Sequence, residues 1–441
     1  MCQTLFYIHS EVAGYPVFGF GLLLALWAVA SIITLVVLAR RQGFNADTWG
    51  YVPILLLIGA VIAFLLPVLC DKSPEGVLGL PIRGYGMMML LAVVSGTSLA
   101  AWRAKRVGLD PDLIFTLVFW MLIPGIIGAR GFHVIEYWHR DYWPAYTSKG
   151  GSLGALVGEI VNVAHGGLVV YGAFFGGLVG MPLFVRKYRL PLLALGDLIA
   201  PSMLLGLAIG RIGCLMNGCC FGAVCDHPWA LQFPVGSPSY IAQAERGQMH
   251  GFKLSGNPDT KPCDVLAVDP DSRADVAGLK RGDRLLRING HQINTTDDAH
   301  RVIVKALLDE QPLIIQASGR PPITVQAVEP PPSQSLPVEP TQPLSTIDAL
   351  LLCLLLLAYD PFRRRDGELF AVMMSIYPVT RFLIEGLRSD EAAVVGTGMS
   401  IGQCVSLLLL LCAAVLWRYI LRQPKGTAFS QRNCQIGFTG K

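Results

Sequence analysis

Uncharged stretches recur along the chain, and each is about as long as a membrane-crossing helix. Roughly 20 helical residues span the ~30 Å hydrocarbon core of a bilayer. Six stretches of about this length carry no charged residue, and they are Val17–Ala39, Tyr51–Cys70, Gly84–Trp102, Leu113–Ala129, Gly166–Val185 and Met399–Trp417. Three weaker stretches contain one charged residue each, and they are Leu190–Gly210, Leu344–Tyr359 and Leu369–Ile384. This pattern predicts about nine transmembrane helices.

The composition agrees with a membrane protein. Of the 441 residues, 53% are hydrophobic and 15% are charged, whereas charged residues make up roughly 25% of a typical soluble protein. A water-soluble domain, a disordered chain and a nucleic-acid-binding protein are therefore excluded together. The formal net charge is +4, and the basic residues lie in short clusters between the apolar stretches. We interpret these clusters as topology signals rather than as a binding surface.

The basic clusters lie beside alternate connections between the predicted spans. Lys and Arg are enriched in the cytoplasmic loops of membrane proteins. The clusters are Arg40/Arg41, Arg103/Lys105/Arg106, Arg186/Lys187/Arg189, Arg363/Arg364/Arg365 and Arg418/Arg422/Lys425. Nine spans with an extracytoplasmic N-terminus put every cluster on the inner side and leave the C-terminus cytoplasmic. The first apolar run lacks a basic leader and a small-residue cleavage pattern, so we expect it to be retained as a span.

A change in composition between Cys225 and Ser345 indicates an inserted soluble module. Its segment Val265–Ile293 predicts a strand, a short helix and a second strand, separated by turns. The segment resembles a PDZ domain, whose core string is matched by Ala277–Leu279, Gly282–Asp283 and Ile288–Gly290. PDZ domains bind extended peptides at a sheet edge, so the resemblance implies a peptide ligand. The Pro-rich stretch 329–343 predicts an extended tether back to the membrane.

Five groups of polar residues lie at the ends of the predicted spans, beside glycines. They are Arg83 and Tyr85; Arg130, His133 and Glu136; His165 with Gly166 and Gly167; Gly210, Arg211, Asn217 and Gly222; and Arg381, Glu385 and Arg388. Ionisable residues at membrane depth are costly, which makes each a candidate functional residue. Each group also has a structural interpretation, namely interfacial anchoring, snorkelling at a helix end, glycine packing or an internal ion pair.

The predicted topology puts all five groups toward the outer leaflet. Arginines there can grip a phosphate bidentately, and glycines let a backbone approach a ligand. Together the groups predict a site for an anionic lipid headgroup and a second, extracytoplasmic reactant. Residue types and spacing alone do not identify the reaction.

The same groups occur in an order that resembles the prolipoprotein diacylglyceryl transferase family. The strings GYG, GAR, HGGL, GRIG with NG and FG, and RFLIE with a following Arg run from about Arg83 to Trp417 around the insert, and GDLIAP, PWALQFP and MSIGQ extend the similarity. The resemblance implies an all-α polytopic membrane protein with seven core helices, two extra N-terminal helices and an inserted extracytoplasmic PDZ-like α+β domain. The implied segments are 1–79 (extra helices), 80–250 and 344–425 (core), 251–328 (PDZ-like insert), 329–343 (linker) and 426–441 (cytoplasmic tail).

The resemblance also implies a reaction at the bacterial inner membrane. The diacylglyceryl group of phosphatidylglycerol moves to the lipobox cysteine thiol of a preprolipoprotein, forming a thioether and releasing glycerol phosphate. His165 is the expected base for the thiol, although headgroup binding or a structural role is open for it too. Arg211 and Arg381 are expected to neutralise the phosphate as it leaves, Tyr85 to orient the headgroup and Glu385 to hold Arg381. The expected substrate-binding residues are Arg130, Gly166, Gly167, Gly210, Asn217, Gly222 and Arg388.

The sequence departs from the family pattern in three places. Cys214 stands where many members have Asn, Cys219 stands where they have an acidic residue, and EPTQPLST (339–346) lacks the family's His, Tyr and Glu. The spacing from Cys214 to Cys219 and from Cys220 to Cys225 fits the wide end of the spacing between zinc ligands. The two pairs are directly adjacent in the sequence, however, and leave no separate second half-site. We therefore expect packing or an extracytoplasmic disulfide, and neither a metal nor a cofactor.

Other functions fit part of the pattern. A membrane zinc protease with a PDZ module would need an H-E-x-x-H pair, and none of the eight histidines begins one. A transporter needs polar groups near the midplane, whereas the predicted groups lie toward one leaflet. A non-catalytic lipid- or lipoprotein-binding scaffold remains open, because the altered cysteine positions are compatible with a lost activity.

Overall fold

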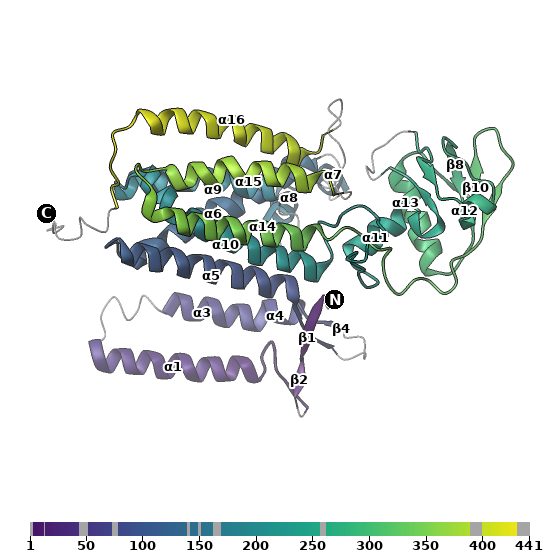
Figure 1. Cartoon of the computed structure of the whole chain (residues 1–441). Helices are drawn as coiled ribbons and strands as arrows, with labels where there is room; N and C mark the ends of the chain where they lie inside the picture. The colour runs from purple at the N-terminus through teal and green to yellow at the C-terminus, as the bar shows by residue number, and fades with distance from the viewer. Residues whose placement is uncertain are drawn as a thin grey trace. The chain divides into compact units, whose positions relative to one another are not determined.

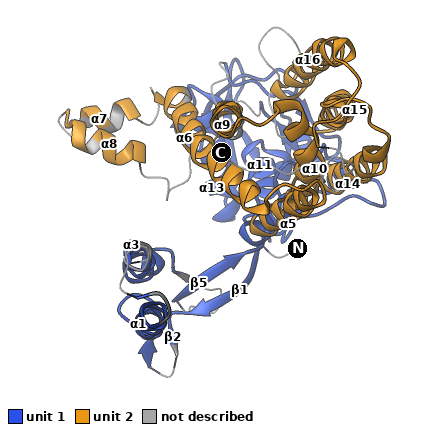
Figure 2. Cartoon of the chain, turned by 90° about the vertical axis from the view of Figure 1, so that its left-hand side faces the viewer, with its two compact units in different colours: residues 1–89, 212–340 blue, residues 90–211, 341–441 orange. Residues whose placement is uncertain are grey.

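The computed structural model describes residues 3–12, 14–43, 52–72, 78–138, 142–148, 151–161, 169–255, 262–388 and 399–429. The chain divides into two compact units (Figure 2). Unit 1 comprises residues 1–89 and 212–340, and unit 2 comprises residues 90–211 and 341–441. The boundaries between the units fall inside helices α5 (Gly84–Arg106) and α10 (Leu192–Asn217).

Unit 2 contains long apolar helices that run alongside one another (Figure 1). In addition to most of α5 and α10, they are α6 (Pro111–Glu136), α9 (Val170–Tyr188), α14 (Thr341–Tyr359), α15 (Glu368–Glu385) and α16 (Ile401–Arg422). Shorter helices are α7 (Trp143–Ser148), α8 (Leu153–Val161) and the 3-10 turn η4 (Asp360–Phe362). Many Leu, Ile, Val and Phe side chains on these helices are exposed, which suits a lipid surrounding rather than water.

Helices α6 and α9 approach each other through glycines. A Cβ atom on Gly176 would lie 2.0 Å from the carbonyl oxygen of Pro124, and one on Gly172 would lie 2.2 Å from that of Gly128. Small residues allow membrane helices to pack with their backbones in contact. Gly172 and Gly176 are thus required by the packing of α6 against α9.

A buried polar network joins the start of α10 to α5 and to the segment before α15. The carboxylate of Asp197 accepts hydrogen bonds from the backbone N–H groups of Gly367 (2.7 Å) and Phe370 (2.9 Å). Arg103 of α5 donates to the backbone carbonyl of Asp197 (2.8 Å) and to the carboxylate of Asp360 (2.8 Å). A buried charge is tolerated when it is paired and hydrogen-bonded, so this network fixes the relative positions of the three segments.

The N-terminal part of unit 1 combines two apolar helical segments with small sheets. Helix α1 covers Leu22–Gln42, and the second segment runs through α3 (Val52–Ala60), the π-helical η1 (Val61–Leu65) and α4 (Leu66–Val68). Strand β5 (Leu78–Arg83) pairs antiparallel with β1 (Thr4–His9) and β4 (Asp71–Lys72), and β2 (Glu11–Val12) pairs with β3 (Tyr15–Pro16). Because β5 leads directly into α5, the β1–β5 pairing fixes the point at which α5 begins.

The insert in unit 1 is an α+β module with a hydrophobic core of its own. Its sheet has the order β11-β10-β8-β9, formed by β8 (Leu285–Ile288), β9 (His291–Gln292), β10 (Leu313–Ala317) and β11 (Ile323–Val325). The other elements are α11 (Pro238–Glu245), η3 (Gln248–His250), the pair β6 (Phe252–Lys253) and β7 (Ala267–Val268), α12 (Arg273–Val276) and α13 (Thr296–Leu308). Ile288, Ile303 and Ile315 are fully buried in its core.

The strand, helix and strand predicted within residues 265–293 are confirmed as β7, α12 and β8. Asn289 and Gly290 have φ angles of 48° and 80°, as the central residues of a type I′ hairpin turn require. The Pro-rich segment pairs with the chain before the insert, because the Leu231 N–H donates to the Val338 carbonyl at 2.9 Å and the reverse bond has the same length. Its last residues are helical rather than extended, since α14 begins at Thr341, and its role as a tether stays a prediction. The assignment of the module to the PDZ domains stays a prediction.

Within the described residues, six helices are long and apolar enough to cross a membrane: α1, α5, α6, α10, α14 with η4, and α16. Helices α9 and α15 and the segment from α3 to α4 occupy the other three predicted positions. The chain is therefore mostly helical and polytopic by length and composition, and the count of nine spans stays a prediction.

Candidate functional site

The residues predicted for the site belong to both units. Unit 2 holds Arg130, Gly210, Arg211, Arg381, Glu385 and Arg388, and unit 1 holds Tyr85, Asn217 and Gly222. His165, Gly166 and Gly167 lie outside the described residues, so their roles stay predictions.

Arg381, Glu385 and Arg388 form one buried charge cluster at the end of α15. The Nη2 atom of Arg381 donates to Oε2 of Glu385 at 2.7 Å, and Nη1 of Arg388 donates to the same oxygen at 3.0 Å. The Glu385 side chain has no exposed surface. The ion pair expected from the four-residue spacing is thus confirmed. Two guanidinium groups share one carboxylate, which leaves this cluster with a formal charge of +1.

Glycine at position 402 makes room for the Glu385 carboxylate. A Cβ atom on Gly402 would lie 2.8 Å from Cδ and 3.0 Å from Oε1 of Glu385. Gly402 occupies the first turn of α16, which begins in a capping box between Ser400 and Gln403. The MSIGQ string therefore supplies both a helix start and the space for a buried carboxylate.

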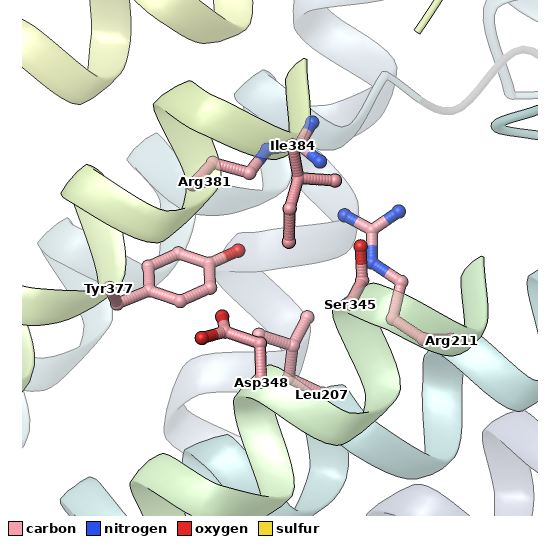
Figure 3. A pocket seen from close by; sticks show the side chains of 7 residues that line it. All are labelled: Leu207, Arg211, Ser345, Asp348, Tyr377, Arg381 and Ile384. Atoms are coloured by element: carbon pink, nitrogen blue, oxygen red, sulfur yellow. The ribbon is translucent and has the colours of Figure 1, made fainter. Parts of the chain in front are cut away.

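Arg211 and Arg381 line the same small pocket, in which α10, α14 and α15 meet (Figure 3). The residues that line it are Leu207, Arg211, Ser345, Asp348, Tyr377, Arg381 and Ile384. Tyr377 and Asp348 lie on one side of the pocket, and Arg211 lies beside Ser345 on the other (Figure 3). The two arginines predicted to bind phosphate are thus brought together, although their helices are far apart in sequence.

One guanidinium nitrogen of Arg381 can donate a hydrogen bond to a ligand. Its Nη2 atom is used by Glu385, whereas Nη1 is buried and has no hydrogen-bond partner among the described residues. A buried donor without a partner costs roughly 1–3 kcal/mol, and more when the group is charged. An anion that accepts a hydrogen bond from Nη1 would remove this cost.

Asp348 and Tyr377 are pocket residues that the sequence analysis did not assign to the site. Asp348 accepts a hydrogen bond from Oγ1 of Thr380 at 2.9 Å, which holds its carboxylate in place. A signal was available for both residues. Asp348 is a carboxylate inside an apolar run, and Tyr377 precedes Arg381 by four residues and so shares its helix face.

Arg130 is engaged with the backbone of a neighbouring helix. Its Nε atom donates to the carbonyl of Ile160 and its Nη2 atom to that of Glu159, each at 2.7 Å. These carbonyls belong to the last turn of α8, where helices leave acceptors unpaired. Close by, Nδ1 of His133 and the Tyr142 hydroxyl are 3.0 Å apart. Arg130 therefore anchors the helix that leads into residues 162–168, and its substrate-binding role stays a prediction.

In unit 1, Tyr85 and Asn217 lie around the end of α10. A Cβ atom on Gly213 would touch Cδ2 of Tyr85 at 3.4 Å, so the start of α5 packs closely on α10. The side-chain amide of Gln3 donates to the Asn217 carbonyl at 3.2 Å. This contact comes from the segment before β1, and neither it nor the β1–β5 pairing was predicted.

Gly222 allows two backbone segments to meet. A Cβ atom on it would lie 2.4 Å from Cβ of Glu339, and its N–H donates to the Glu339 carbonyl at 3.3 Å. Gly222 is therefore required by packing. Gly210 lies within α10, directly before Arg211.

Comparison with known proteins gives a consistent result. The family model described as "Prolipoprotein diacylglyceryl transferase" matches residues 76–419. A Rhodopirellula baltica protein named phosphatidylglycerol–prolipoprotein diacylglyceryl transferase is 33% identical over 456 residues, which covers 94% of this chain and 88% of the relative.

Shorter matches carry the same name. A Synechococcus elongatus protein is 36% identical over 169 residues, covering 38% of this chain and 53% of the relative. A Mycobacterium leprae protein is 34% identical over 173 residues, covering 38% of this chain and 49% of the relative.

Proposed function

The chain belongs to the prolipoprotein diacylglyceryl transferase family, and we propose that the pocket formed by α10, α14 and α15 serves the reaction of this family. The enzyme transfers the diacylglyceryl group of phosphatidylglycerol to the lipobox cysteine thiol of a preprolipoprotein. The sulfur forms a bond to the terminal glycerol carbon of the lipid, and the bond from that carbon to the phosphate oxygen breaks. The thiol proton goes to a base, and glycerol phosphate leaves.

The single observation that supports this role of the pocket most strongly is the state of Arg381. Its guanidinium is held by Glu385 on one side and presents a buried, unpartnered Nη1 atom on the other. A phosphate diester bears one negative charge, and the leaving phosphate gains a second. Donors that are positioned before the reaction stabilise such developing charge without reorganisation. Arg211, which lines the same pocket, is the second phosphate ligand in this proposal.

Polar groups around the arginines orient the reactants. The Tyr377 hydroxyl and the Asp348 carboxylate project into the pocket (Figure 3). A hydroxyl can donate to a phosphate oxygen, while a carboxylate repels it. In our proposal Tyr377 therefore binds the lipid phosphate, and Asp348 limits the positions that the phosphate can take.

His165 is proposed as the base for the thiol. Histidine side chains in general titrate with a pKa of about 6.5 and so suit proton transfer near neutral pH, and His165 follows Arg130 in the order of the family strings. The other residues proposed to take part in the reaction are Tyr85, Asn217, Arg130, Arg388 and Gly210, and the glycines at 166, 167 and 222 are proposed to allow close backbone approach.

The proposed setting is the bacterial inner membrane. In this proposal the N-terminus and the insert are extracytoplasmic and the C-terminus is cytoplasmic, because the basic clusters then lie inside. Residues 1–79 are extra helices, 80–250 and 344–425 form the transferase core, and 426–441 form a cytoplasmic tail. The module at 251–328 is proposed to bind an extended peptide at a sheet edge, as PDZ domains do, with 329–343 as its link to the core.

The test of this function is incubation of the purified full chain with labelled phosphatidylglycerol and a lipobox peptide. Formation of a thioether-linked lipopeptide, with release of glycerol phosphate, is the expected result. Binding of lipid or peptide without any thioether product would instead favour the non-catalytic scaffold.

A further inference from the structure

Three cysteine sulfurs lie together at the end of α10. The Sγ atoms of Cys214, Cys219 and Cys220 all lie within 4.8 Å of one another. The three residues are half-buried, and none forms a disulfide. The sequence predicts packing or a disulfide for these cysteines. Residue spacing does not show that the three thiols converge in space.

The backbone after α10 turns so that the second and third cysteines return to the first. The Cys214 carbonyl accepts hydrogen bonds from the N–H groups of Gly218 (2.9 Å) and Cys219 (3.2 Å). Gly218 has a φ of 78° and Cys220 a φ of 57°. The left-handed region costs a residue with a side chain about 1–2 kcal/mol. The chain therefore accepts an unfavourable conformation at Cys220 in the turn that gathers the thiols.

The turn is also held from outside. The Gly218 carbonyl accepts from the Ser239 N–H at 3.1 Å, and a Cβ atom at Gly218 would lie 3.0 Å from the Phe233 ring. Such support keeps the three sulfurs near one another, as a binding site requires.

The distances suit a metal ion bound by thiolates. A zinc–sulfur bond of ~2.3 Å in tetrahedral geometry places two sulfurs roughly 3.8 Å apart. The three sulfurs are already within 4.8 Å, so each pair has to close by roughly 1 Å or less. A disulfide needs two sulfurs about 2.05 Å apart and leaves the third thiol unused.

We propose that Cys214, Cys219 and Cys220 bind one thiophilic metal ion, such as Zn²⁺, and leave its fourth position open for a thiolate. Among the described residues the group supplies three ligands, and zinc sites with three protein ligands take an exogenous fourth one. Each cysteine loses its thiol proton on binding. The Cys219 sulfur donates a weak hydrogen bond to the Cys214 carbonyl at 3.8 Å, which holds it beside Cys214 before a metal binds.

The fourth ligand follows from the chemistry of the reaction, and this step rests on the proposed function. The acceptor is a thiol that must lose its proton before it attacks carbon. Coordination to the metal would favour loss of that proton, which would pass to the base of the proposed reaction. Within unit 1, Cys214 adjoins Gly213, which packs against Tyr85, so the ion would lie near one residue that is already proposed for the reaction.

The first test measures metal content without any transfer reaction. The full chain is purified in detergent with a reductant, equilibrated with Zn²⁺ and freed of excess metal. One Zn²⁺ per chain is expected for the wild type and for Cys412→Ser, whose cysteine is exposed on α16. Cys214→Ser, Cys219→Ser and Cys220→Ser should each lose most of it. No bound Zn²⁺ in the reduced wild type, or full binding in all three variants, would overturn the proposal.

The second test replaces Zn²⁺ with Co²⁺ and follows the thiolate-to-cobalt charge-transfer absorption. Addition of a lipobox peptide should increase this absorption by about one third, as a fourth thiolate joins three. The same peptide with Ser in place of Cys should leave it unchanged, and an equal response to both peptides would refute an open thiolate position. If the metal-free wild type transfers lipid, the metal proposal is wrong and the proposed function stands. If the protein binds metal but transfers no lipid under any condition, the proposed function is wrong.

Discussion

Nη2 of Arg381 donates to Oε2 of Glu385 across one turn of α15, at a distance of 2.7 Å. This bond fixes the plane of the guanidinium and leaves its Nη1 atom buried without a partner among the described residues. Arg388 binds the same carboxylate oxygen, so the carboxylate has more positive charge around it than it can neutralise. The ion pair between Arg381 and Glu385 is therefore suited to holding Arg381 in place for an anionic ligand.

Replacement of Glu385 by Gln should lower the transfer rate about 10- to 100-fold. A hydrogen bond to a charged group contributes about 1.5–3 kcal/mol. Gln keeps one acceptor oxygen but loses the negative charge that both guanidinium groups share at Oε2. The measurement is kcat and KM for phosphatidylglycerol, with the exposed insert residue Glu310→Gln as the matched control. Equal kinetics in both variants would show that the pair does not position Arg381.

The Gly402→Ala variant should impair transfer without removing any polar group. The added methyl group would lie 2.8 Å from Cδ of Glu385 and would displace the carboxylate from its arginines. Gly206→Ala on α10 is the control, because the nearest atom to its Cβ would be a carbonyl oxygen at 3.5 Å. A Gly402→Ala enzyme as active as Gly206→Ala would contradict the packing described for Glu385.

Two adjacent glycines on α9 should respond differently to the same substitution. In Gly176→Ala the methyl group would lie 2.0 Å from the Pro124 carbonyl oxygen, so α6 and α9 must move apart. In Gly177→Ala the nearest atom is Cε of Met121 at 3.8 Å, and alanine is favoured over glycine within a helix by roughly 0.5–1 kcal/mol. We expect the thermal midpoint in detergent to fall by several degrees for the first variant only. A similar fall for both would indicate that the helices do not approach through Gly176.

The insert should lose stability as the pH falls from about 6.5 to 4. His250 is 1% exposed, and neither ring nitrogen has a hydrogen-bond partner among the described residues. Burial, assisted by Arg273, lowers the pKa of His250 from 6.5 to about 4. The unfolded state therefore takes up a proton first, and stability that is complete above pH 6.5 declines by about 2 kcal/mol at pH 5.

Hydrogen exchange in the full chain measures this effect at the insert. Protection of the β10 amides, corrected for intrinsic exchange, should be lower at pH 5 than at pH 7.5. The difference should shrink in His250→Phe and in His250→Gln, neither of which titrates in this range. Equal loss of protection in the wild type and both variants would assign the pH dependence to other groups.

The positions of the long helices and the pair on α15 could be predicted from the sequence, because both depend on local spacing. Hydrophobic runs locate the helices, and the four-residue spacing of Arg381 and Glu385 predicts their contact. The pocket could be predicted only in part. Asp348 meets Thr380 across two helices, and a contact of this kind has no local signal.

The β1–β5 pairing and the convergence of three thiols were not predictable for the same reason. Phe6 pairs with Ile82 although most of the N-terminal region separates them in the sequence. Cys220 is brought back to Cys214 by a turn in which Cys220 itself has a left-handed conformation. Residue spacing gives the distance between such positions along the chain but not in space. His165, which the sequence predicts as the base, lies outside the described residues.

The most direct test of the account is the transfer rate of Arg381→Ala with labelled phosphatidylglycerol and a lipobox peptide. Loss of a positioned donor to developing charge typically costs about 10²- to 10³-fold in kcat. We expect a loss of that size in Arg381→Ala, while Arg418→Ala, whose side chain is exposed on α16, keeps the wild-type rate. An Arg381→Ala enzyme that forms the thioether at the wild-type rate would contradict the assignment of this pocket to the phosphate.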